Sequence, residues 1–293
     1  MHSVTVELVA NQHNDVGEGP VWLEGEQRLV WVDITRHLVQ WFDPTTGRVE
    51  QLDVGADVGA VAPTTSGDLI AAIGNRFQLI DPKSGRIRTL AFVNPDYPES
   101  RMNEGKCDSH GRFWAGTMAV DADRPGAGAL YRLNLDHTVD RVISDVTISN
   151  GLDWTEDDRL MYFIDTMSYR VDMLDFESST GSIANRRPLI RIDKADGWPD
   201  GMTVDSEGGL WVALWGGWSV RRYWPDGRLH FEIAVPASQV SSCVFGGSDL
   251  SDLYITTAAS GLSAQELENQ PYAGGLFRCR PGHVGRPPHK FRG

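Results

Sequence analysis

A turn that recurs along the chain constrains the fold more than any other feature of the sequence. The stretch DPTTGR at residues 43–48 returns as DPKSGR at residues 81–86, and looser glycine turns follow in ESSTGSI and WPDGRL. Three of these turns come after a short run of alternating apolar and polar residues, namely HLVQWFD, RFQLID and VRRYW. Such a run is typical of a half-buried strand that closes a hairpin, so the chain is built from repeated hairpins.

A more strongly apolar strand precedes each hairpin, and this strand sets the number of repeats. It occurs as RLVWVDI, DLIAAIG, RFWAGTM, RLMYFIDT, GLWVALWG and DLYITTA, at intervals of about 40 to 49 residues, the length of a four-stranded propeller blade. The repeats contain no long amphipathic helical pattern, which argues against a helical solenoid or an alternating βα fold. We therefore predict an all-β fold, a six-bladed β-propeller forming one domain over residues 1–293, with the N-terminal strand SVTVELV paired into the last blade.

Charge and composition exclude several classes of partner. The 293 residues include 40 acidic and 27 basic side chains, which gives a formal net charge of −13. Nucleic acids and anionic membranes are bound by clustered Lys and Arg, so neither is expected as a partner. No apolar run approaches the roughly 20 residues that a membrane-spanning helix needs. The first residues lack the basic and apolar regions of a secretory signal, so a cytoplasmic location is expected.

Two further features are expected to have structural roles only. The three cysteines, Cys107, Cys243 and Cys279, are widely spaced, and they are predicted to be buried thiols rather than disulfide partners or zinc ligands. The short basic tail RPPHKFRG at the C-terminus is predicted to be a solvated terminus rather than a binding arm.

The register of the repeat brings polar residues to one place. Counting back about ten residues from the apolar strand of each unit reaches Glu18, Gly59, Asn103, Asn150, Asp200 and Cys243. Four of these six positions carry a side-chain oxygen. The innermost strand of each propeller blade lines the central channel, so equivalent positions of different blades converge on the axis.

Carboxylates at the axis need a compensating positive charge. Glu18 and Asp200 would repel one another there and raise each other's pKa. A divalent cation removes this repulsion, and the amide oxygen of Asn150, with Asn103 acting through a water molecule, completes a set of oxygen donors that favours Ca²⁺, Mg²⁺ or Mn²⁺. The alternative is that Asn-Gly and Asp-Gly are ordinary turn formers and that Glu18-Gly19 ends a loop.

Five motifs together carry a family resemblance. GEGPVW, the run from Arg101 to Met118 (RMNEGKCDSHGRFWAGTM), SNGLDW, PDGMTVDSEGGLWVALWGG and FGGSDLSDLYITTA resemble the senescence marker protein, regucalcin and gluconolactonase family over nearly the whole chain. The resemblance implies a six-bladed propeller with one divalent cation in its channel and, for many members, hydrolysis of sugar lactones. Calcium is the first choice of cation, with zinc, manganese, magnesium and iron as alternatives.

The resemblance also implies roles for individual residues. Glu18, Asn150 and Asp200 would hold the metal, and Arg101 and Asn103 would contact the substrate. Asp121 is the nearest match to an acidic residue that helps to bind sugar in some members. This chain departs from the family pattern at two positions: Glu104 stands where Asp is usual, and Asp121 is shorter than the more familiar Glu.

The predicted function is a metal-dependent lactonase that opens a sugar lactone to the aldonic acid. The metal would polarise the lactone carbonyl and lower the pKa of bound water, and Asp200 is the candidate general base. A calcium-binding regulatory protein without turnover, a propeller scaffold for protein partners, and a promiscuous esterase or organophosphate hydrolase remain as alternatives. No G-x-S-x-G, H-E-x-x-H or Walker motif is present.

Secondary predictions concern residues around this site. Lys106 is expected to pair with a neighbouring carboxylate such as Asp108, beneath the site. Asp153 and Asp205 are expected, like Asp108, to cap hairpin turns. Trp215 and Trp218 either pack within the blades or wall a sugar pocket.

Overall fold

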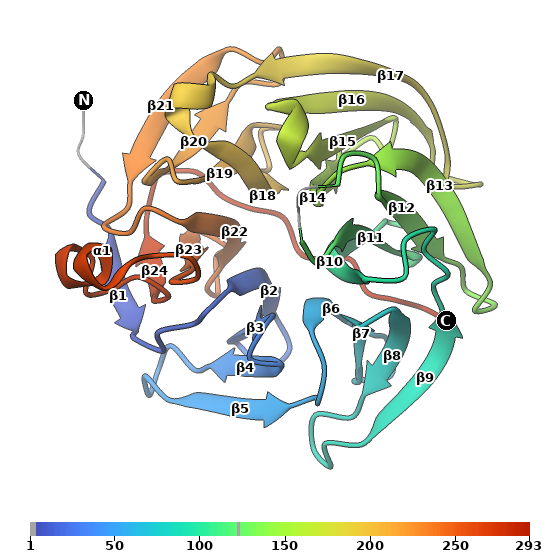
Figure 1. The fold of residues 1–293 in the computed structure, drawn as a ribbon, viewed down its shortest axis with the longest axis horizontal. Helices are drawn as coiled ribbons and strands as arrows, with labels where there is room; N and C mark the ends of the chain where they lie inside the picture. The colour runs from blue at the N-terminus through green and yellow to red at the C-terminus, as the bar shows by residue number, and fades with distance from the viewer. Residues whose placement is uncertain (1–3, 122–123) are drawn as a thin grey trace.

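Six antiparallel sheets surround a central axis in the computed structural model, which describes residues 4–121 and 124–293. Each sheet has four strands, and in five of them the strands follow one another in chain order (Figure 1). The predicted all-β six-bladed propeller is confirmed.

The strands of the first three blades run from the inside of the ring outward. Their bounds are β2 (Gly17–Leu23), β3 (Arg28–Asp33), β4 (Leu38–Phe42) and β5 (Val49–Asp53); β6 (Val58–Pro63), β7 (Leu69–Ile73), β8 (Arg76–Ile80) and β9 (Ile87–Phe92); and β10 (Ser100–Cys107), β11 (Phe113–Ala119), β12 (Gly128–Leu133) and β13 (Val139–Val146).

The remaining blades follow the same pattern, with three short helices in their connections. The strands are β14 (Ser149–Trp154), β15 (Leu160–Asp165), β16 (Arg170–Glu177) and β17 (Ser182–Arg191); β18 (Trp198–Val204), β19 (Leu210–Trp215), β20 (Ser219–Tyr223) and β21 (Leu229–Ala234); and β22 (Val240–Gly246), β23 (Asp252–Thr257), β24 (Leu276–Cys279) and β1 (Glu7–Ala10). The 3-10 helices are η1 (Thr166–Ser168) and η2 (Lys194–Asp196), and the α-helix is α1 (Ala264–Asn269).

The N-terminal strand closes the ring, as predicted. Strand β1 pairs antiparallel with β24 in the last blade, and the pairing is reinforced by an ion pair of 2.6 Å between Glu7 and Arg278. Closure of this kind covers an edge of the last sheet that would otherwise be free to pair with another chain.

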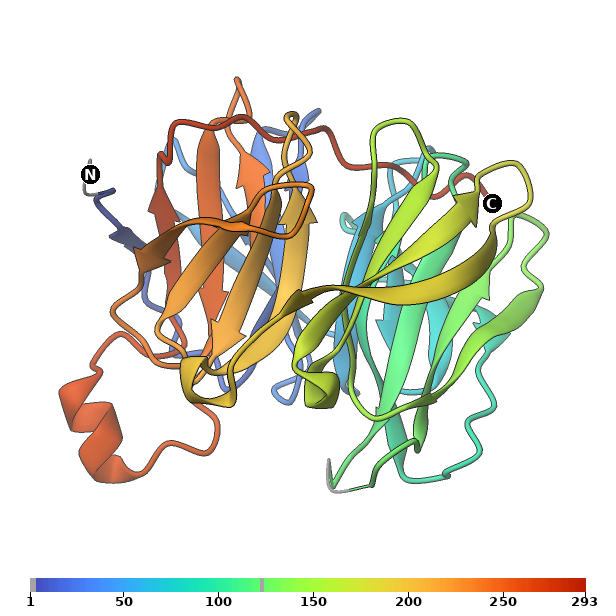
Figure 2. The same cartoon turned by 90° about the horizontal axis from the view of Figure 1, so that it is seen from above.

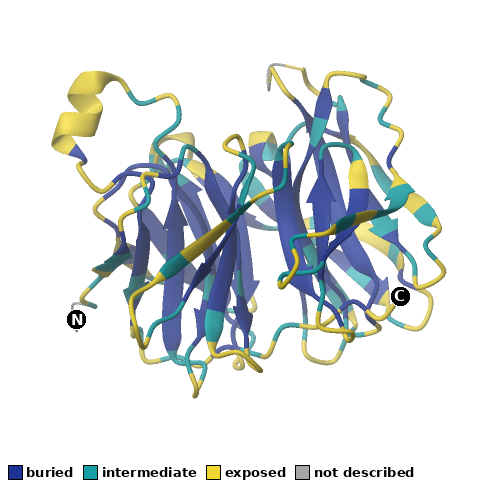
Figure 3. Cartoon of the chain, turned by 90° about the horizontal axis from the view of Figure 1, so that it is seen from below, coloured by how far each residue is buried: buried dark blue, intermediate teal, exposed yellow. Residues whose placement is uncertain are grey.

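Burial follows the position of each strand in its blade. The inner strands β2, β6 and β14 are buried along almost their whole length. Outer strands such as β5 and β13 consist mostly of exposed and partly buried residues, and Figure 3 shows the same contrast between the inside and the outside of the ring. Neighbouring blades share apolar layers: Phe77 of the second blade and Phe113 of the third pack edge to face with centroids 5.8 Å apart. All three cysteines are buried and free, as predicted.

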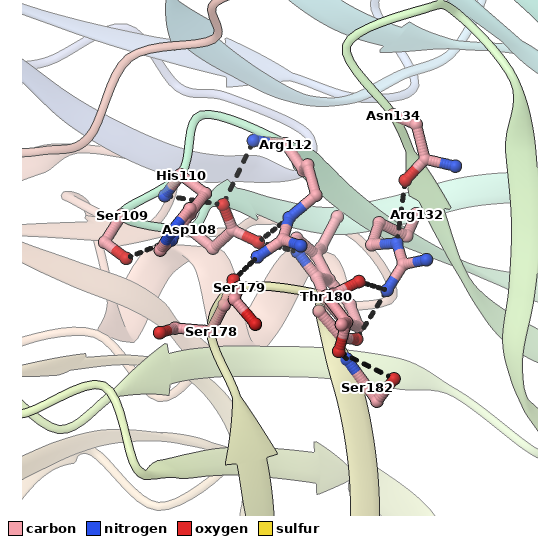
Figure 4. A network of polar contacts seen from close by, with 12 residues as sticks. Asp108, Ser109, His110, Arg112, Arg132, Asn134, Ser178, Ser179, Thr180 and Ser182 are labelled. Atoms are coloured by element: carbon pink, nitrogen blue, oxygen red, sulfur yellow. Dashed lines mark hydrogen bonds and ion pairs between the residues drawn. The ribbon is translucent and has the colours of Figure 1, made fainter.

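Two of the three predicted turn caps are confirmed. Asp108 accepts hydrogen bonds from the backbone N–H groups of His110 and Arg112, both at 3.0 Å, and one of 2.8 Å from the indole of Trp114 (Figure 4). Asp205 makes the equivalent contacts in the fifth blade, including one of 2.8 Å from an indole N–H. Each carboxylate thus ties a hairpin turn to a buried Trp of the strand that follows.

The C-terminal tail is not a solvated terminus, and that prediction is wrong. Residues 281–293 cross the end of the ring opposite to η1, η2 and α1 (Figures 1 and 2). The segment is tied to blades far apart in the sequence by backbone and side-chain hydrogen bonds that include Gly285 to Leu250 at 2.8 Å, Arg286 to Trp154 at 2.7 Å, Phe291 to Pro63 at 2.9 Å and Arg292 to Gly111 at 3.1 Å. Phe291 is completely buried, and this apolar anchor is the physical reason that the basic segment docks.

The two ends of the ring are therefore different, and we call them the helical end and the tail end. The helical end carries η1, η2 and α1, and the tail end is crossed by residues 281–293 (Figure 2). None of the helices in residues 4–121 and 124–293 has the length and apolar character that crossing a membrane requires.

Candidate metal centre

The three predicted metal ligands come from the inner strands of three different blades. Glu18 lies in β2, Asn150 in β14 and Asp200 in β18, and each side chain is at least 95% buried. Each residue is near the start of its strand. Asn150 donates a hydrogen bond of 3.1 Å to Thr166 of η1, which places the group at the helical end of the channel.

A local irregularity presents each of these residues to the axis. The pairing register shifts between Glu18 and Val21 in β2, between Ser149 and Leu152 in β14, and between Pro199 and Met202 in β18. Such β-bulges place two residues opposite one and re-aim side chains. The same shift occurs in β10, immediately after Met102.

The glycines that follow the ligands allow the inner strands to crowd together. A Cβ atom at Gly151 would lie 2.7 Å from the backbone oxygen of Asp200, and one at Gly201 would lie 2.1 Å from the hydroxyl of Ser242. The Asn-Gly and Asp-Gly pairs therefore lie within strands, where glycine provides space, and the alternative that they are turn formers is wrong.

Burial and mutual repulsion make the two carboxylates unfavourable as a bare pair. The pKa of Glu18 is raised well above its usual range by burial first and then by the charges of Asp200 and Glu104, with Arg101 opposing the shift. Burial and the charge of Glu104 likewise raise the pKa of Asp200 well above its usual range. Asn150 donates its second amide hydrogen bond to Asp200.

The amide oxygen of Asn150 indicates which kind of group the site can bind. It is buried, and no group among the described residues donates a hydrogen bond to it. A buried carbonyl oxygen without a partner costs about 1–3 kcal/mol, and two buried carboxylates add to that cost. A divalent cation bound by these three oxygen donors would satisfy the amide oxygen and neutralise the carboxylates, so the residues present fit a hard metal ion.

Asn150 is essential to this arrangement because carboxylates alone are too few. Across residues 4–121 and 124–293, no three His, Cys, Asp or Glu side chains gather closely enough to hold a metal by themselves. Two carboxylates and one amide from protein leave coordination positions for water and substrate, which is typical of catalytic metal sites.

Arg101 and Asn103 lie beside this group on β10. Arg101 donates a hydrogen bond of 2.7 Å to the amide oxygen of Asn103, whose amide nitrogen donates one of 2.9 Å to the backbone of Ser149. Burial lowers the pKa of Arg101, while the charges of Asp57, Glu18 and Asp200 oppose that shift. Asn103 therefore holds the Arg101 guanidinium in the field of the carboxylates.

Asp121 is the one predicted site residue that the structure does not bring into contact with the others. Its carboxylate is exposed and accepts a hydrogen bond of 3.0 Å from Arg124. The guanidinium of Arg124 in turn lies over the ring of Tyr97, 4.4 Å from its centroid. Within the described part of the chain, no hydrogen bond or ion pair joins Asp121 to Arg101 or Asn103.

Glu104 is a buried acidic group at the axis that the sequence reasoning did not include in the site. Its carboxylate accepts a hydrogen bond of 3.2 Å from Gly105, lies 3.5 Å from the hydroxyl of Ser242, and has a pKa raised by burial. The β-bulge in β10 presents Glu104 as well as Asn103. The sequence signal that could have identified Glu104 is its position directly after Asn103, one of the aligned residues of the repeat.

Lys106 pairs with a different carboxylate from the one predicted. Its ammonium donates hydrogen bonds of 2.9 Å to Asp153 and 3.0 Å to the backbone oxygen of Met202, whereas Asp108 binds Arg112 at 2.7 Å. The reason is that Asp108 lies past the end of β10, where it caps the hairpin. Strand β14 of the neighbouring blade places Asp153 beside Lys106.

Asp153 is accordingly not a turn cap, and that prediction is wrong. It accepts hydrogen bonds from Lys106 and the backbone of Val204, and it pairs with Arg286 of the tail at 3.3 Å. Burial alone would raise the pKa of Asp153, but these two cations outweigh burial and lower it. Thr155 closes the adjacent hairpin instead. Lys106, Asp153 and Arg286 line a cavity of about 330 Å³ at the tail end.

Comparison with known proteins identifies the family of the chain. Residues 16–259 match the model of the SMP-30/Gluconolactonase/LRE-like region. The chain belongs to this family. It is 41% identical to regucalcin from Danio rerio over 297 residues and 39% identical to regucalcin from Homo sapiens over 300 residues, with both chains covered completely in each case.

Solved structures give the same result. A luciferin-regenerating enzyme superposes with a TM-score of 0.93 at 32% identity, covering 99% of this chain and 100% of the other. A calcium-binding protein, regucalcin, from Agrobacterium tumefaciens superposes with a TM-score of 0.95 at 26% identity, covering 99% of this chain and 98% of the other. A gluconolactonase from Xanthomonas campestris, 23% identical with a TM-score of 0.75, shares the fold.

Proposed function

We propose that this protein is a metal-dependent lactonase that hydrolyses a sugar lactone to its aldonic acid. The observation that carries the proposal is the convergence of Glu18, Asn150 and Asp200 on one buried point, with the amide oxygen of Asn150 left without a donor in the described structure. Membership of a family whose name includes gluconolactonase supports the choice of reaction.

The chemistry requires positive charge at a carbonyl oxygen and a base for water. A divalent cation bound here would supply Lewis acidity and lower the pKa of a bound water molecule. Glu18 and Asn150 act as ligands that fix its position. Asp200 also acts as the base, because its carboxylate lies at the same point. It accepts the proton of the water that attacks the lactone carbonyl and returns it to the ring oxygen when the ester bond opens.

Arg101 provides the binding contact for the substrate. Its guanidinium has five donors, of which one nitrogen binds Asn103 and the backbone of Met102. Its other donors have no hydrogen-bond acceptor among residues 4–121 and 124–293, so they can bind ring hydroxyls and then the carboxylate that forms on hydrolysis. Because Asn103 fixes the guanidinium plane, little conformational entropy is lost when the substrate binds.

A lactone hydrolysis assay with metal restoration tests the proposal. Chelated protein is supplied with Ca²⁺, Mg²⁺, Mn²⁺, Fe²⁺ or Zn²⁺ in turn, and acid release from glucono-, xylono-, arabinono- and galactonolactone is followed with a pH indicator. We expect activity that depends on added metal and falls by at least a hundredfold in Asp200→Asn. Asp226→Asn, at an exposed hairpin turn, is the matched control. Full activity of Asp200→Asn would refute the mechanism.

A calcium-binding protein without turnover is the second candidate. The observation that favours it is the description of the Agrobacterium tumefaciens relative as calcium-binding. Calorimetry separates the two functions: micromolar or tighter Ca²⁺ binding without hydrolysis of any lactone under any metal would select the second. Hydrolysis of aryl esters or organophosphates in place of lactones would assign the same site to a promiscuous esterase.

A further inference from the structure

Exposed apolar side chains gather at one end of the ring. The large apolar residues that are more than a third exposed at the helical end are Phe92, Val120, Met167, Trp198, Trp218, Leu267 and Tyr272. They lie at this end because each belongs to a connection that follows a second strand, as η1 does, to the start of an inner strand, as Asn150 does, or to the end of an outer strand. Single exposed apolar residues are common, but a contiguous group indicates a binding surface.

Five apolar or aromatic residues lie at the helical end of blades four and five, and we call this group the apolar shelf: Met167, Tyr169, Trp198, Trp215 and Trp218. Tyr169 ends the turn of η1 that contains Met167, and its hydroxyl accepts a hydrogen bond from the indole of Trp198. Trp198 pairs with Trp215 across β18 and β19. Trp215 and Trp218 flank one tight turn, closed by a bond of 2.9 Å from Gly217 to Leu214.

Two side chains of the shelf, Trp198 and Tyr169, are held in place although they are partly exposed. The indole N–H of Trp198 is occupied by Tyr169, and the ammonium of Lys194 lies 5.0 Å from the centroid of the Tyr169 ring. Trp198 nevertheless keeps 42% of its surface exposed, and Trp218 and Met167 each keep 45%. Because their polar atoms are bonded to each other, the rings of Trp198 and Tyr169 offer mainly apolar contact to a ligand.

The shelf adjoins the candidate metal centre directly. Trp198 precedes Asp200 by two residues on β18, so their Cα atoms are within about 7 Å. On the fourth blade, Met167 follows Thr166, which holds the amide of Asn150 by a bond of 3.1 Å. If a lactone is bound with its carbonyl at the axis, a substituent on its ring that extends out of the channel would lie over these side chains.

We infer that the site takes lactones whose ring carries an apolar or aromatic substituent, and that the apolar shelf binds that substituent. The inference rests on the proposed function, because the lactone ring itself is placed by the metal centre and Arg101. A bare aldonolactone, with hydroxyl groups on every carbon, would leave the shelf in contact with water. A substituent that covers it removes apolar surface from water on both partners.

A series of γ-lactones with unbranched alkyl chains of zero to six carbons tests this inference. Burial of one methylene is worth about a fourfold gain, so kcat/KM of the metal-loaded protein should rise roughly two- to fourfold per carbon over the first few carbons. The same slope should appear in the affinity of the matching non-hydrolysable γ-lactams, measured by calorimetry. The slope is a ratio within one protein, so it does not depend on the fraction of protein that is folded.

Two variants test whether the dependence of kcat/KM on alkyl chain length arises from contact with the apolar shelf. Trp198→Ser and, independently, Met167→Ser should each flatten the dependence on chain length. Leu135→Ser, which removes an exposed apolar side chain from the loop between β12 and β13 at the tail end, is the matched control and should keep the wild-type slope. Equal slopes in the shelf variants and the control would overturn the inference.

The outcomes separate the inference from the proposed function. Hydrolysis of bare aldonolactones with a flat alkyl slope would leave the lactonase in place and refute the role of the shelf. No hydrolysis of any lactone would refute the proposed function, and the lactam affinities would then decide the shelf alone. A flat lactam slope together with self-association that Trp198→Ser abolishes in sedimentation equilibrium would assign the shelf to a second copy of the chain.

Discussion

Replacement of Phe291 by alanine tests whether the C-terminal segment belongs to the propeller. The Phe291 side chain is completely buried among the second and third blades. Its backbone is fixed on both sides by hydrogen bonds of 2.9 Å, one donated to Pro63 and one accepted from Thr65. Truncation of a buried Phe to Ala costs about 3–5 kcal/mol, and here the loss is limited by the free energy with which the segment docks.

The amide of Thr65 reports that docking free energy directly. It lies in the second blade, but its hydrogen-bond acceptor is in the tail, so detachment of the tail exposes it to exchange. A loss of about 3 kcal/mol corresponds to roughly hundredfold faster exchange, since each 1.4 kcal/mol is a factor of ten. The midpoint of thermal unfolding should fall by about 6 °C, at roughly 2 °C per kcal/mol for a chain of this size.

An exposed residue next to Phe291 provides the control variant. Lys290→Ala removes an exposed neighbour and should change neither quantity. If Phe291→Ala left the exchange of the Thr65 amide and the thermal midpoint at wild-type values, the segment would not be docked as described, and its basic residues would be a free terminus after all.

Three further predictions concern the candidate metal centre and the Asp153–Arg286 ion pair at the tail end. A divalent cation at a hundred times its Kd should stabilise the protein by about 2.7 kcal/mol, or about 5 °C, in thermal unfolding with and without chelator. Asp200→Asn should abolish that shift. Arg101→Lys keeps the charge but loses the planar fork, so kcat/KM for lactones should fall about tenfold or more; unchanged steady-state kinetics would contradict its role. Arg286→Gln should destabilise most near neutral pH. Asp153, with its lowered pKa, contributes stability above its ordinary pKa and loses it as pH falls through the folded value. The urea midpoints of wild type and variant should therefore converge as the pH falls below the ordinary pKa of an aspartate, and a constant gap would argue against an electrostatic role for Arg286.

The repeat explains why so much of the molecule could be predicted from sequence. Strand alternation, hairpin turns and their spacing are local properties, and they fixed the number of blades and the pairing of β1 into the last one. The phase of the repeat also identified Glu18, Asn150 and Asp200, because equivalent positions of a closed ring must meet at its axis.

Contacts between blades could not be predicted in the same way. Lys106 selects Asp153 rather than Asp108 because a neighbouring blade supplies the nearer carboxylate. Glu104 occupies the second position of the β-bulge in β10, where β14 and β18 have the glycines Gly151 and Gly201. Asp121 lies in a connection, where repeat phase carries no positional information, and the structure pairs it with Arg124.

The sequence by itself thus determined the blades, the order of the strands and the residues that converge on the channel, since each of these follows from period and spacing. Only the tertiary structure decided that the tail docks, that Lys106 and Arg286 share Asp153, and that the apolar shelf lies beside the candidate metal centre. The physical reason is that these features depend on distances between segments that no local pattern encodes: burial of Phe291, the partner of a buried charge and the exposure of Trp198 are set by the closed ring as a whole.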